Sequence, residues 1–506
     1  METLALYGDR LTLEDVQRVA RPGGPRVTLA DEARPGIEAA RKVVDDAVAE
    51  GRVVYGLTTG FGALAEVVIP PGRITELQEN LIRSHAAGVG EPLPEPEVRA
   101  IMLLRANVLA LGHSGVRPLV IERILELLNH GIHPVVPSRG SVGASGDLAP
   151  LSHIALALMG EGEVRVRDEG GASRRRPAAE ALAAAGLEPV QLAAKEGLAL
   201  NNGTQAMTGV GALALLAAER AVETAEVAGA MSLEAMRGTP DPFDEAIQRV
   251  RPQPGQAESA RRLRTLLADS EIRESHREGD PRVQDAYSLR CMPQVHGAAR
   301  QAFRYARGVL EVEANSATDN PLIFPDRGRI LSGGNFHGQP VAQVMDLVAM
   351  ACADLASISE RRLARLVDPD LSGLPAFLTP EPGTNSGFMI PQIAAASLVN
   401  EIRLLAAPAS TDSIPTDANK EDHVSMGMTA ARQARDAVHL LETVLALELL
   451  AAAQGLEFLL PLKPGAGVAR AYARIRERVE PLTRDRVLGP DIEAVEGLVR
   501  AGAFAE

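Results

Sequence analysis

The carboxyl-terminal part of the chain contains a long stretch, residues 429–455, that reads TAARQARDAVHLLETVLALELLAAAQG. It has no proline, its apolar residues recur at the helical period, and it ends at a glycine, so it predicts one long helix. Apolar residues spaced by three and four between positions 341 and 358 mark one face of another helix. Residues 205–236 and 296–315 indicate two more. After residue 200 we therefore expect a bundle of long helices.

The composition also suits packing of helix against helix. Apolar residues make up 46% of the chain, but aromatic residues only 3%, and there is no tryptophan, so alanine and leucine must fill most of the core. A length of 506 residues exceeds what one compact core normally accommodates. We predict a mainly α protein with a mixed N-terminal domain over residues 1–200. An elongated helical bundle with C-terminal helices is expected over residues 201–506.

The first two hundred residues show a mixed pattern. Helical stretches at 97–112 and 118–130 are separated by turn signals rich in proline and glycine. A pair of strands is expected within residues 163–177, with Gly170 and Gly171 at its turn.

Charge and cysteine content limit the partners and the compartment. The net charge of −14 disfavours nucleic acid and anionic membranes, because both attract positive surfaces. Cys291 and Cys352 cannot build a disulfide framework, and their scarcity fits a reducing cytoplasm. Charged residues interrupt the N-terminus, so we expect no signal peptide. The longest run without charge, Leu198 to Ala218, is too polar at its start to span a membrane.

The stretch GSVGASGDLAP, residues 140–150, concentrates small residues immediately before an apolar run. Asp147 is a suitable N-cap, Pro150 suits a first helical turn, and the apolar run ends at Gly160, so a helix is expected there. Residues 143–146 would then lie at the positive end of the helix dipole, where an anion can bind.

The triplet Ala144–Ser145–Gly146 in this loop permits a second, covalent interpretation. If the backbone bends tightly, the Gly146 nitrogen can attack the Ala144 carbonyl carbon. Loss of two water molecules, one of which removes the Ser145 hydroxyl, leaves a five-membered ring with an exocyclic methylene. Ala144 and Gly146 are small enough not to obstruct closure, and Gly143 permits the bend. The product would be a strong electrophile.

The fourteen residues GSVGASGDLAPLSH resemble the signature of the aromatic amino acid ammonia-lyases, and similar motifs extend over most of the chain. These motifs are YGLTTGFG (55–62), RSHAAGVGEP (83–92), KEGLALNNGTQ (195–205), QDAYSLRCMPQVHG (284–297), TDNPL (318–322), SGGNFHGQP (332–340), NSGFMI (385–390) and NKEDHVSMG (419–427).

The resemblance implies a prosthetic group, a fold and an assembly. The group is 4-methylideneimidazol-5-one (MIO), formed autocatalytically from Ala144, Ser145 and Gly146, with no external cofactor and no metal. The fold is the helical architecture shared by ammonia-lyases and fumarase-type enzymes. The assembly is a homotetramer whose active sites combine residues from three subunits.

The resemblance also implies roles for individual residues in the elimination of ammonia. Tyr55 would take the β-proton, and its glycine-rich loop would act as a lid. A phenol is mostly protonated at neutral pH, so we expect the site to depress its pKa. Arg290 would bind the substrate carboxylate in a two-pronged fashion. Tyr287 and Gln284 are spaced so that one helical turn aligns them with Arg290 and would help to polarise the site and bind substrate.

Four further residues are expected around the substrate. Asn202 would donate or accept a hydrogen bond near the ring, and Phe336 would pack on the ring or the substrate. His85 follows Ser84, and this pair is typical of the histidine-specific branch of the family. Glu421 is the stronger indication of substrate, because a carboxylate accepts the imidazole N–H of histidine, whereas a phenyl ring offers it nothing. The implied reaction converts L-histidine to trans-urocanate and ammonia, the first step of histidine degradation.

Four residues depart from the pattern of the histidine-specific branch, and they keep other substrates open. Thr58 and His113 are more typical of the phenylalanine, tyrosine and aminomutase branches. Lys420 replaces a frequent glutamine and can pair with Glu421, and Asn201 is polar where an aliphatic residue is usual. The alternative is therefore a tyrosine or phenylalanine ammonia-lyase, or a tyrosine 2,3-aminomutase, on the same scaffold.

Other classes of function have less support from the sequence. The loop G-S-S-x-M-P-x-K-x-N of fumarase-type lyases does not occur, and neither does a phosphate-binding P-loop or a dinucleotide fingerprint. His130 and His133 have no third ligand next to them, so no metal site is expected. A helical scaffold without activity would predict an unmodified Ser145.

Overall fold

The computed structural model describes residues 2–168 and 171–505, which form two compact units. Unit 1 comprises Met1–Leu213, Arg307–Asp346 and Pro408–Arg432, and unit 2 comprises Ala214–Ala306, Leu347–Ala407 and Gln433–Glu506.

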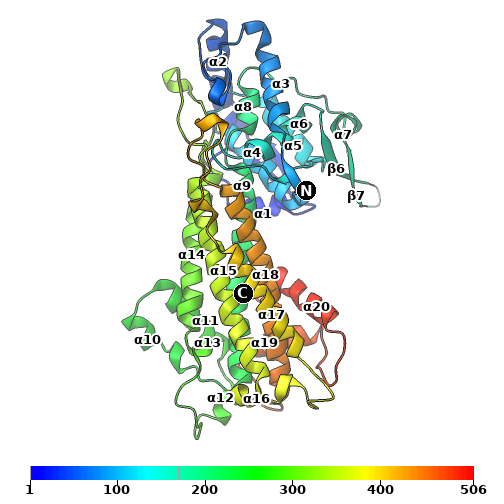
Figure 1. Ribbon diagram of the computed structural model, residues 1–506, viewed down its shortest axis with the longest axis vertical. Helices are drawn as coiled ribbons and strands as arrows, with labels where there is room; N and C mark the ends of the chain where they lie inside the picture. The colour runs from blue at the N-terminus through cyan, green and yellow to red at the C-terminus, as the bar shows by residue number, and fades with distance from the viewer. Residues whose placement is uncertain (1, 169–170, 506) are drawn as a thin grey trace. The chain divides into compact units, whose positions relative to one another are not determined.

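Unit 1 combines short strands with helices of moderate length (Figure 1). Its strands are β1 (Thr3–Leu6), β2 (Arg26–Leu29), β3 (Val89–Pro92), β4 (His133–Pro134), β5 (Pro137–Arg139), β6 (Glu163–Arg167), β7 (Ser173–Pro177), β8 (Leu322–Phe324) and β9 (Arg329–Leu331). Its helices are α1 (Leu13–Ala20), α2 (Arg34–Ala49), α3 (Ile74–His85), α4 (Glu95–Ala110), α5 (Pro118–Asn129), α6 (Leu148–Leu158), α7 (Ala178–Ala184) and α8 (Glu196–Asn201).

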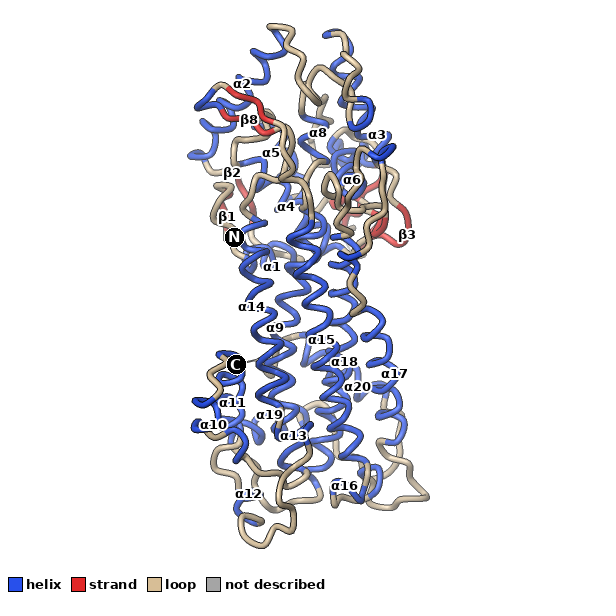
Figure 2. Tube along the Cα trace, turned by 60° about the vertical axis from the view of Figure 1, so that its left-hand side comes forward, coloured by secondary structure: helices blue, strands red, loops and turns tan. Residues whose placement is uncertain are grey.

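Unit 2 is built from helices alone in the part of the chain that the structure describes (Figure 2). The helices wholly within it are α10 (Glu245–Val250), α11 (Pro254–Leu266), α12 (Glu271–Ser275), α13 (Tyr287–Arg290), α16 (Pro369–Ser372), α17 (Met389–Leu405), α19 (Ala466–Arg476) and α20 (Gly489–Arg500). Four long helices have residues in both units: α9 (Gln205–Ala235), α14 (Met292–Ala314), α15 (Gln339–Val367) and α18 (Gly427–Glu457).

The strands form small separate sheets rather than one continuous sheet. β1 pairs with β2 in parallel, β3 with β5 and β8 with β9 antiparallel, and β4, β6 and β7 form a three-stranded antiparallel sheet. The predicted strand pair at 163–177 is confirmed as β6 and β7, with Glu163 opposite Pro177 and Arg167 opposite Ser173. Gly170, predicted at its turn, lies outside the described residues.

The core of unit 1 is centred on α4, which is buried on all sides from Glu97 to Ala110. A helix that is buried around its whole circumference is covered on all faces, and α1 and α5 both pack against α4. α4 also carries Arg105, whose side chain is fully buried. Its guanidinium donates hydrogen bonds to the carbonyl oxygens of Ala199 and Asn202, so the core helix holds the backbone at the end of α8.

The core of unit 2 is filled mainly by alanine, leucine and valine side chains, as the composition predicts. One buried carboxylate connects three helices within it. Glu448 of α18 accepts hydrogen bonds from Ser232 of α9 and from Ser359 and Arg362 of α15, each at 2.6 Å. Arg362 and Glu448 are both completely buried, so each charge depends on the other for compensation.

The long helices lie where the periodicity predicts them. The four predicted stretches correspond to α9, α14, α15 and α18, and the apolar face predicted on α15 is buried at all its members: Val341, Val344, Val348, Ala351, Leu355 and Ile358. α15 is also apolar and long enough to pass a compositional test for a membrane span. Core helices of globular proteins pass the same test, and 56% of the apolar window in α15 is buried within the protein.

The two units are composed of non-consecutive segments, whereas the sequence predicts one division between residues 200 and 201. Long helices cause this difference, because a helix such as α9 or α18 begins in one unit and ends in the other. The chain consequently returns twice to unit 1 after residue 213, and both returns contribute to the candidate active site.

Candidate active site

The loop that carries Ala144–Ser145–Gly146 leads directly into α6, as predicted. Gly143 and Gly146 adopt left-handed backbone conformations, with φ of +68° and +69°. A Cβ atom on Gly146 would collide with the carbonyl of Gly203, because the two backbones are paired by a β-bridge. Position 146 therefore tolerates only glycine, as the sequence-based interpretation of the triplet expects.

Asp147 occupies the N-cap position of α6, but its side chain does not cap that helix. The carboxylate instead accepts the backbone N–H of Met207 at 2.8 Å, in the first turn of α9, and the Ser141 hydroxyl at 2.7 Å. The prediction of a side-chain cap on α6 is thus wrong, because the carboxylate instead accepts an N–H group in the first turn of α9, where such groups have no partner within the helix. Burial raises the pKa of Asp147 to about 6.

A cavity of about 690 Å³ in unit 1 contains most of the predicted site residues. Its lining includes Tyr55, His85, Ser145, Asn202, Phe336 and Glu421. Ala144 and Gly146 flank Ser145 in the chain. The structure therefore brings the triplet, the proposed base and the proposed specificity residues to one cavity.

Ser145 and Glu421 are in direct contact within this cavity. The Ser145 hydroxyl donates to Glu421 Oε1 at 2.6 Å, and the Thr416 hydroxyl donates to Glu421 Oε2, also at 2.6 Å. In the described residues, Lys420 forms no ion pair with Glu421, and its side chain is exposed. The possible pairing of Lys420 with this carboxylate is therefore not found, and the Glu421 side chain lines the cavity.

A strained turn precedes Glu421. Asp417, Ala418 and Asn419 have φ of 47°, 52° and 67°, although none is a glycine. Such residues persist in the left-handed region only where the surrounding structure holds them. Asp417 also lines the cavity, and its carboxylate accepts the Ala63 N–H at 3.1 Å. No motif in the sequence singled out Asp417, because its partner is more than three hundred residues away.

A hydrogen bond within the loop that carries Tyr55 fixes the position of the tyrosine hydroxyl. The Gly62 N–H donates to the Tyr55 hydroxyl at 3.2 Å. Burial raises the pKa of Tyr55; the Gly62 hydrogen bond opposes this increase, and the charges of Asp417 and Glu421 reinforce it. The expectation that the site depresses this pKa is therefore wrong for the protein chain alone. Glu421, which the sequence predicts as a specificity determinant, and Asp417, which it does not, are both acidic, and negative charges disfavour a phenolate.

His85 lies at the end of α3 beside the cavity, and burial lowers its pKa. Its Nδ1 is 2.9 Å from the Ser84 hydroxyl oxygen. At neutral pH the imidazole is therefore uncharged and has a second ring nitrogen for a ligand in the cavity.

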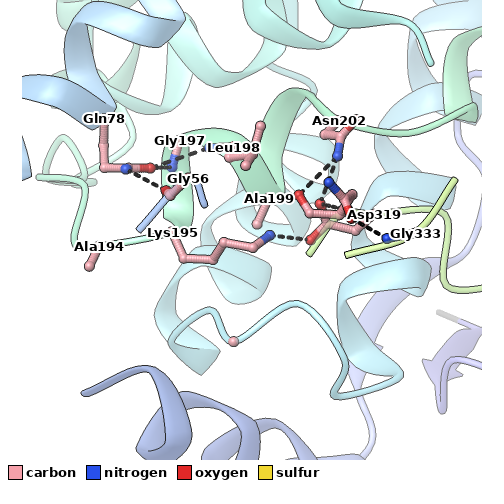
Figure 3. Close-up of polar contacts among 12 residues, drawn as sticks. Gly56, Gln78, Ala194, Lys195, Gly197, Leu198, Ala199, Asn202, Asp319 and Gly333 are labelled. Carbon is pink, nitrogen blue, oxygen red and sulfur yellow. Dashed lines mark hydrogen bonds and ion pairs between the residues drawn. The ribbon is translucent and has the colours of Figure 1, made fainter. Parts of the chain in front are cut away.

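Behind the cavity, a group of buried polar side chains holds its wall in place (Figure 3). Asn202 donates through Nδ2 to Asp319 Oδ1 at 3.2 Å and to the Asn320 carbonyl oxygen at 3.1 Å. Lys195 Nζ lies 2.6 Å from Asp319 Oδ2. Neither Lys195 nor Asp319 was predicted from the sequence as part of the site.

Gln78 of α3 connects the Tyr55 loop to α8 (Figure 3). Its Nε2 donates to the Gly56 carbonyl oxygen at 3.2 Å, and its Oε1 accepts the N–H groups of Gly197 and Leu198 at 3.0 and 3.3 Å. The side chain is fully buried, so no water replaces it. Gln78 thereby fixes the residue that follows Tyr55.

Replacement of Gln78 by leucine should destabilise the protein by about 3 kcal/mol, because three buried backbone groups lose their partner. Thermal and denaturant unfolding measure this loss. The exposed Gln253→Leu variant, which removes no buried hydrogen bond, is the matched control and should unfold like the native protein. Equal stability of the two variants would contradict the assignment of Gln78 as a buried connector.

The remaining predicted residues, Gln284, Tyr287 and Arg290, belong to unit 2. Tyr287 and Arg290 form the ends of α13, and the Arg290 guanidinium lies 4.4 Å from the centre of the Tyr287 ring. Gln284 precedes the helix, because Ala286 is extended with φ −62° and ψ 156°. The prediction that one helical turn aligns all three is therefore wrong for Gln284. Their roles toward the substrate stay predictions.

The residues that depart from the histidine-specific pattern have structural roles in unit 1. Thr58 donates to the Arg52 carbonyl oxygen and accepts the Val54 N–H. His113 donates through Nδ1 to the Ile323 carbonyl oxygen, and Asn201 donates to the Ser152 hydroxyl. None of Thr58, His113, Asn201 and Lys420 belongs to the lining of the cavity.

Comparisons with known proteins identify the family of the chain. Residues 11–477 match the family model described as aromatic amino acid lyase. The chain is 58% identical to the histidine ammonia-lyase of Anaeromyxobacter sp. (strain K) over 100% of both chains. It is 55% identical to that of Myxococcus xanthus (strain DK1622), over 99% of this chain and 97% of the relative.

Solved structures show the same fold. The histidine ammonia-lyase of Trypanosoma cruzi matches with a TM-score of 0.92 and 44% identity, over 100% of this chain and 94% of that one. The tyrosine aminomutase of Streptomyces globisporus matches with a TM-score of 0.92 and 39% identity, over 99% and 97%. The chain belongs to the aromatic amino acid lyase family. The predictions of a mainly α fold and of a carbon–nitrogen lyase are confirmed.

Proposed function

We propose that the chain eliminates ammonia from L-histidine to give trans-urocanate, using MIO formed from Ala144, Ser145 and Gly146. The observation that carries this proposal is the contact of Ser145 with Glu421, which places a carboxylate beside the reactive triplet. A carboxylate accepts the imidazole N–H of histidine, and it would be left unpaired against a phenyl ring. The relatives at 55–58% identity that are named histidine ammonia-lyase support the same substrate.

The residues around the triplet fit MIO. The left-handed Gly146 and its contact with Gly203 leave no room for a side chain, and the hydroxyl of Ser145 reaches the cavity. When present, MIO supplies an electrophile that converts the substrate amine into a competent leaving group. Ala144, Ser145 and Gly146 would form it, and Asn202 and Phe336 would line its surroundings.

The other residues in the cavity provide orientation and proton transfer. Tyr55 takes the β-proton, and the backbone N–H of Gly62 holds its hydroxyl in place. Glu421 and the neutral His85 orient the imidazole through hydrogen bonds. The walls contribute Leu64, Leu81 and Leu198, whose apolar surfaces exclude water and strengthen these polar interactions.

We also propose that the protein acts as a homotetramer with shared sites in the cytoplasm. Tyr287, with Arg290 stacked on it, is 70% exposed in the single chain, which is unusual for a large ring and leaves the ring accessible to another copy. Arg290, with Gln284 and Tyr287, would bind the substrate carboxylate there. The free cysteines Cys291 and Cys352 are compatible with a reducing compartment.

A tyrosine 2,3-aminomutase, or a tyrosine or phenylalanine ammonia-lyase, is the second candidate. The fold of the Streptomyces globisporus aminomutase favours it, as do Thr58 and His113. Against it, both departures lie outside the lining of the cavity, where Glu421 and His85 are present. The cavity thus retains the residues that favour an imidazole.

The test of the substrate is the Glu421→Gln variant, assayed with histidine, tyrosine and phenylalanine. Loss of the charged acceptor should lower kcat/KM for histidine by about 10- to 100-fold, because a hydrogen bond to a charged group contributes about 1.5–3 kcal/mol. Activity toward phenylalanine should not fall. Formation of urocanate is followed by absorbance, with β-amino acids determined in parallel.

The control for this experiment is Lys420→Gln, which changes the neighbouring exposed residue and should leave the histidine preference intact. Intact-mass measurement verifies that each variant has lost two water molecules. A Glu421→Gln enzyme with the native preference for histidine would refute the assigned role of Glu421.

A further inference from the structure

A buried ion pair lies directly behind two residues that line the cavity. Lys195 and Asp319 are 0% and 1% exposed, and Nζ lies 2.6 Å from Oδ2 (Figure 3). Lys195 has a left-handed backbone, with φ of 72°, which is costly for a residue with a Cβ. The chain thus accepts both strain and the desolvation of two charges at this place.

Asp319 makes contacts that lead directly to the cavity wall. Its Oδ1 accepts Nδ2 of Asn202 at 3.2 Å and the backbone N–H of Asn320 at 2.6 Å. Asn202 and Asn320 both line the cavity, whereas Lys195 and Asp319 do not. Asn202 and Asn320 are thus the contacts through which Asp319 reaches the cavity wall.

The surroundings of Asn202 determine which end of its amide is free. Its two N–H groups meet two acceptors, the Asp319 carboxylate and the Asn320 carbonyl oxygen, and neither of these can donate a proton. Its Oδ1 is buried and has no hydrogen-bond partner among the described residues. Arg105 holds the backbone carbonyl of Asn202 from the other side.

We propose that the Lys195–Asp319 ion pair is a positioning device that keeps the amide oxygen of Asn202 available as an acceptor for the substrate amine. Lys195 Nζ donates to Oδ2 of Asp319, and the N–H groups of Asn202 and Asn320 donate to Oδ1, so both oxygens of this side chain act as acceptors. An asparagine at position 319 would be able to donate, so only the Asn320 carbonyl oxygen would still require an N–H group of Asn202, and one contact instead of two would hold the amide in this orientation. The inference rests on the proposed elimination of ammonia from an amino acid.

The test is a double-mutant cycle with Asp319→Asn and Asn202→Ala. Asparagine at 319 has the same shape as aspartate but offers a donor. Asp319→Asn alone should lower kcat/KM for histidine by about 100-fold, the scale of loss that misplacement of a catalytic contact causes. In the Asn202→Ala background, the same change should cost less than about threefold, because its target is gone. A merely structural role would lower activity by the same factor in both backgrounds.

Controls separate positioning from loss of a buried charge pair. Glu448→Gln breaks the buried ion pair between Glu448 and Arg362, and neither of these residues lines the cavity. This variant is the matched control for the loss of stability. Asp319→Asn should match it in thermal unfolding but show a far larger loss of kcat/KM. Intact mass must show the loss of two water molecules in each variant that enters the cycle, and Lys195→Met replaces Asp319→Asn if the latter lacks the modification.

The proposal is overturned if Asp319→Asn stays within about threefold of the native enzyme, if the two changes multiply independently, or if both Asp319→Asn and Lys195→Met remain unmodified. The failure of the proposed substrate is recognised separately. If the native protein turns over tyrosine or phenylalanine instead of histidine, the same cycle is measured with that amino acid.

Discussion

The Ser145→Ala variant is expected to lose at least about a thousandfold in kcat and to keep the mass of the unmodified chain, as is typical when a group that performs the chemistry is removed. Alanine has no β-hydroxyl to eliminate, so the exocyclic methylene cannot form. The native protein should be lighter than its sequence by two water molecules. Dehydration already removes the Ser145 hydroxyl, and with it the contact to Glu421, from the native enzyme, so the variant should unfold within a few degrees of the native temperature.

The matched control is Ser141→Ala in the same loop. Ser141 donates to the Asp147 carboxylate but contributes no atom to the triplet. This variant should still lose two water molecules. A native preparation that is active at full mass, or a Ser145→Ala protein with native turnover, would remove the basis of the proposed chemistry.

The Tyr55→Phe variant should lose turnover on a similar scale, about a thousandfold or more, while retaining the dehydrated triplet. The ring of phenylalanine fills the same space but cannot accept the β-proton. Intact mass and histidine deamination, measured on the same preparation, separate this defect from that of Ser145→Ala. The exposed Tyr305→Phe variant is the control and should behave like the native enzyme.

The pH dependence provides a second readout for Tyr55. Burial raises its pKa above the ordinary value, so the phenolate is a minor species at neutral pH. Below the pKa of a base, the fraction in the basic form increases about tenfold for each pH unit. The kcat/KM of the native enzyme should therefore increase toward alkaline pH, and the residual activity of Tyr55→Phe should lack this increase. A native profile that declines above neutral pH would exclude a phenolate base.

The sequence predicted the helices well because their signal is local. The apolar face of α15 and the lengths of α9 and α18 follow from residues three and four positions apart, and tertiary packing preserves them. The short helix α13 was placed less well. The extended backbone of Ala286 excludes Gln284 from the helix, and spacing by three residues cannot reveal that interruption.

Some residues of the cavity and its surroundings were predicted from the sequence, and those that were missed each have a hydrogen-bond partner far away in the chain. Tyr55, Ser145 and Glu421 stand in distinctive motifs, whereas Asp417, Gln78 and Asp319 act through partners far away in the sequence. The wrong expectation for the pKa of Tyr55 has the same origin. Burial and the nearby carboxylates depend on tertiary structure, and the motif around a tyrosine contains neither.

The turn formed by Asp417, Ala418 and Asn419 implies that thermal stability and substrate specificity cannot both be increased at this place. Glycine at position 418 would relieve about 1 kcal/mol of backbone strain, so a screen for heat resistance should select it. The same relaxation would make the position of the Glu421 carboxylate, three residues further on, less fixed. The preference for an imidazole over a phenyl ring in the substrate would then decrease. Selection for thermal stability alone would thus be expected to produce a more stable enzyme that accepts a broader range of substrates.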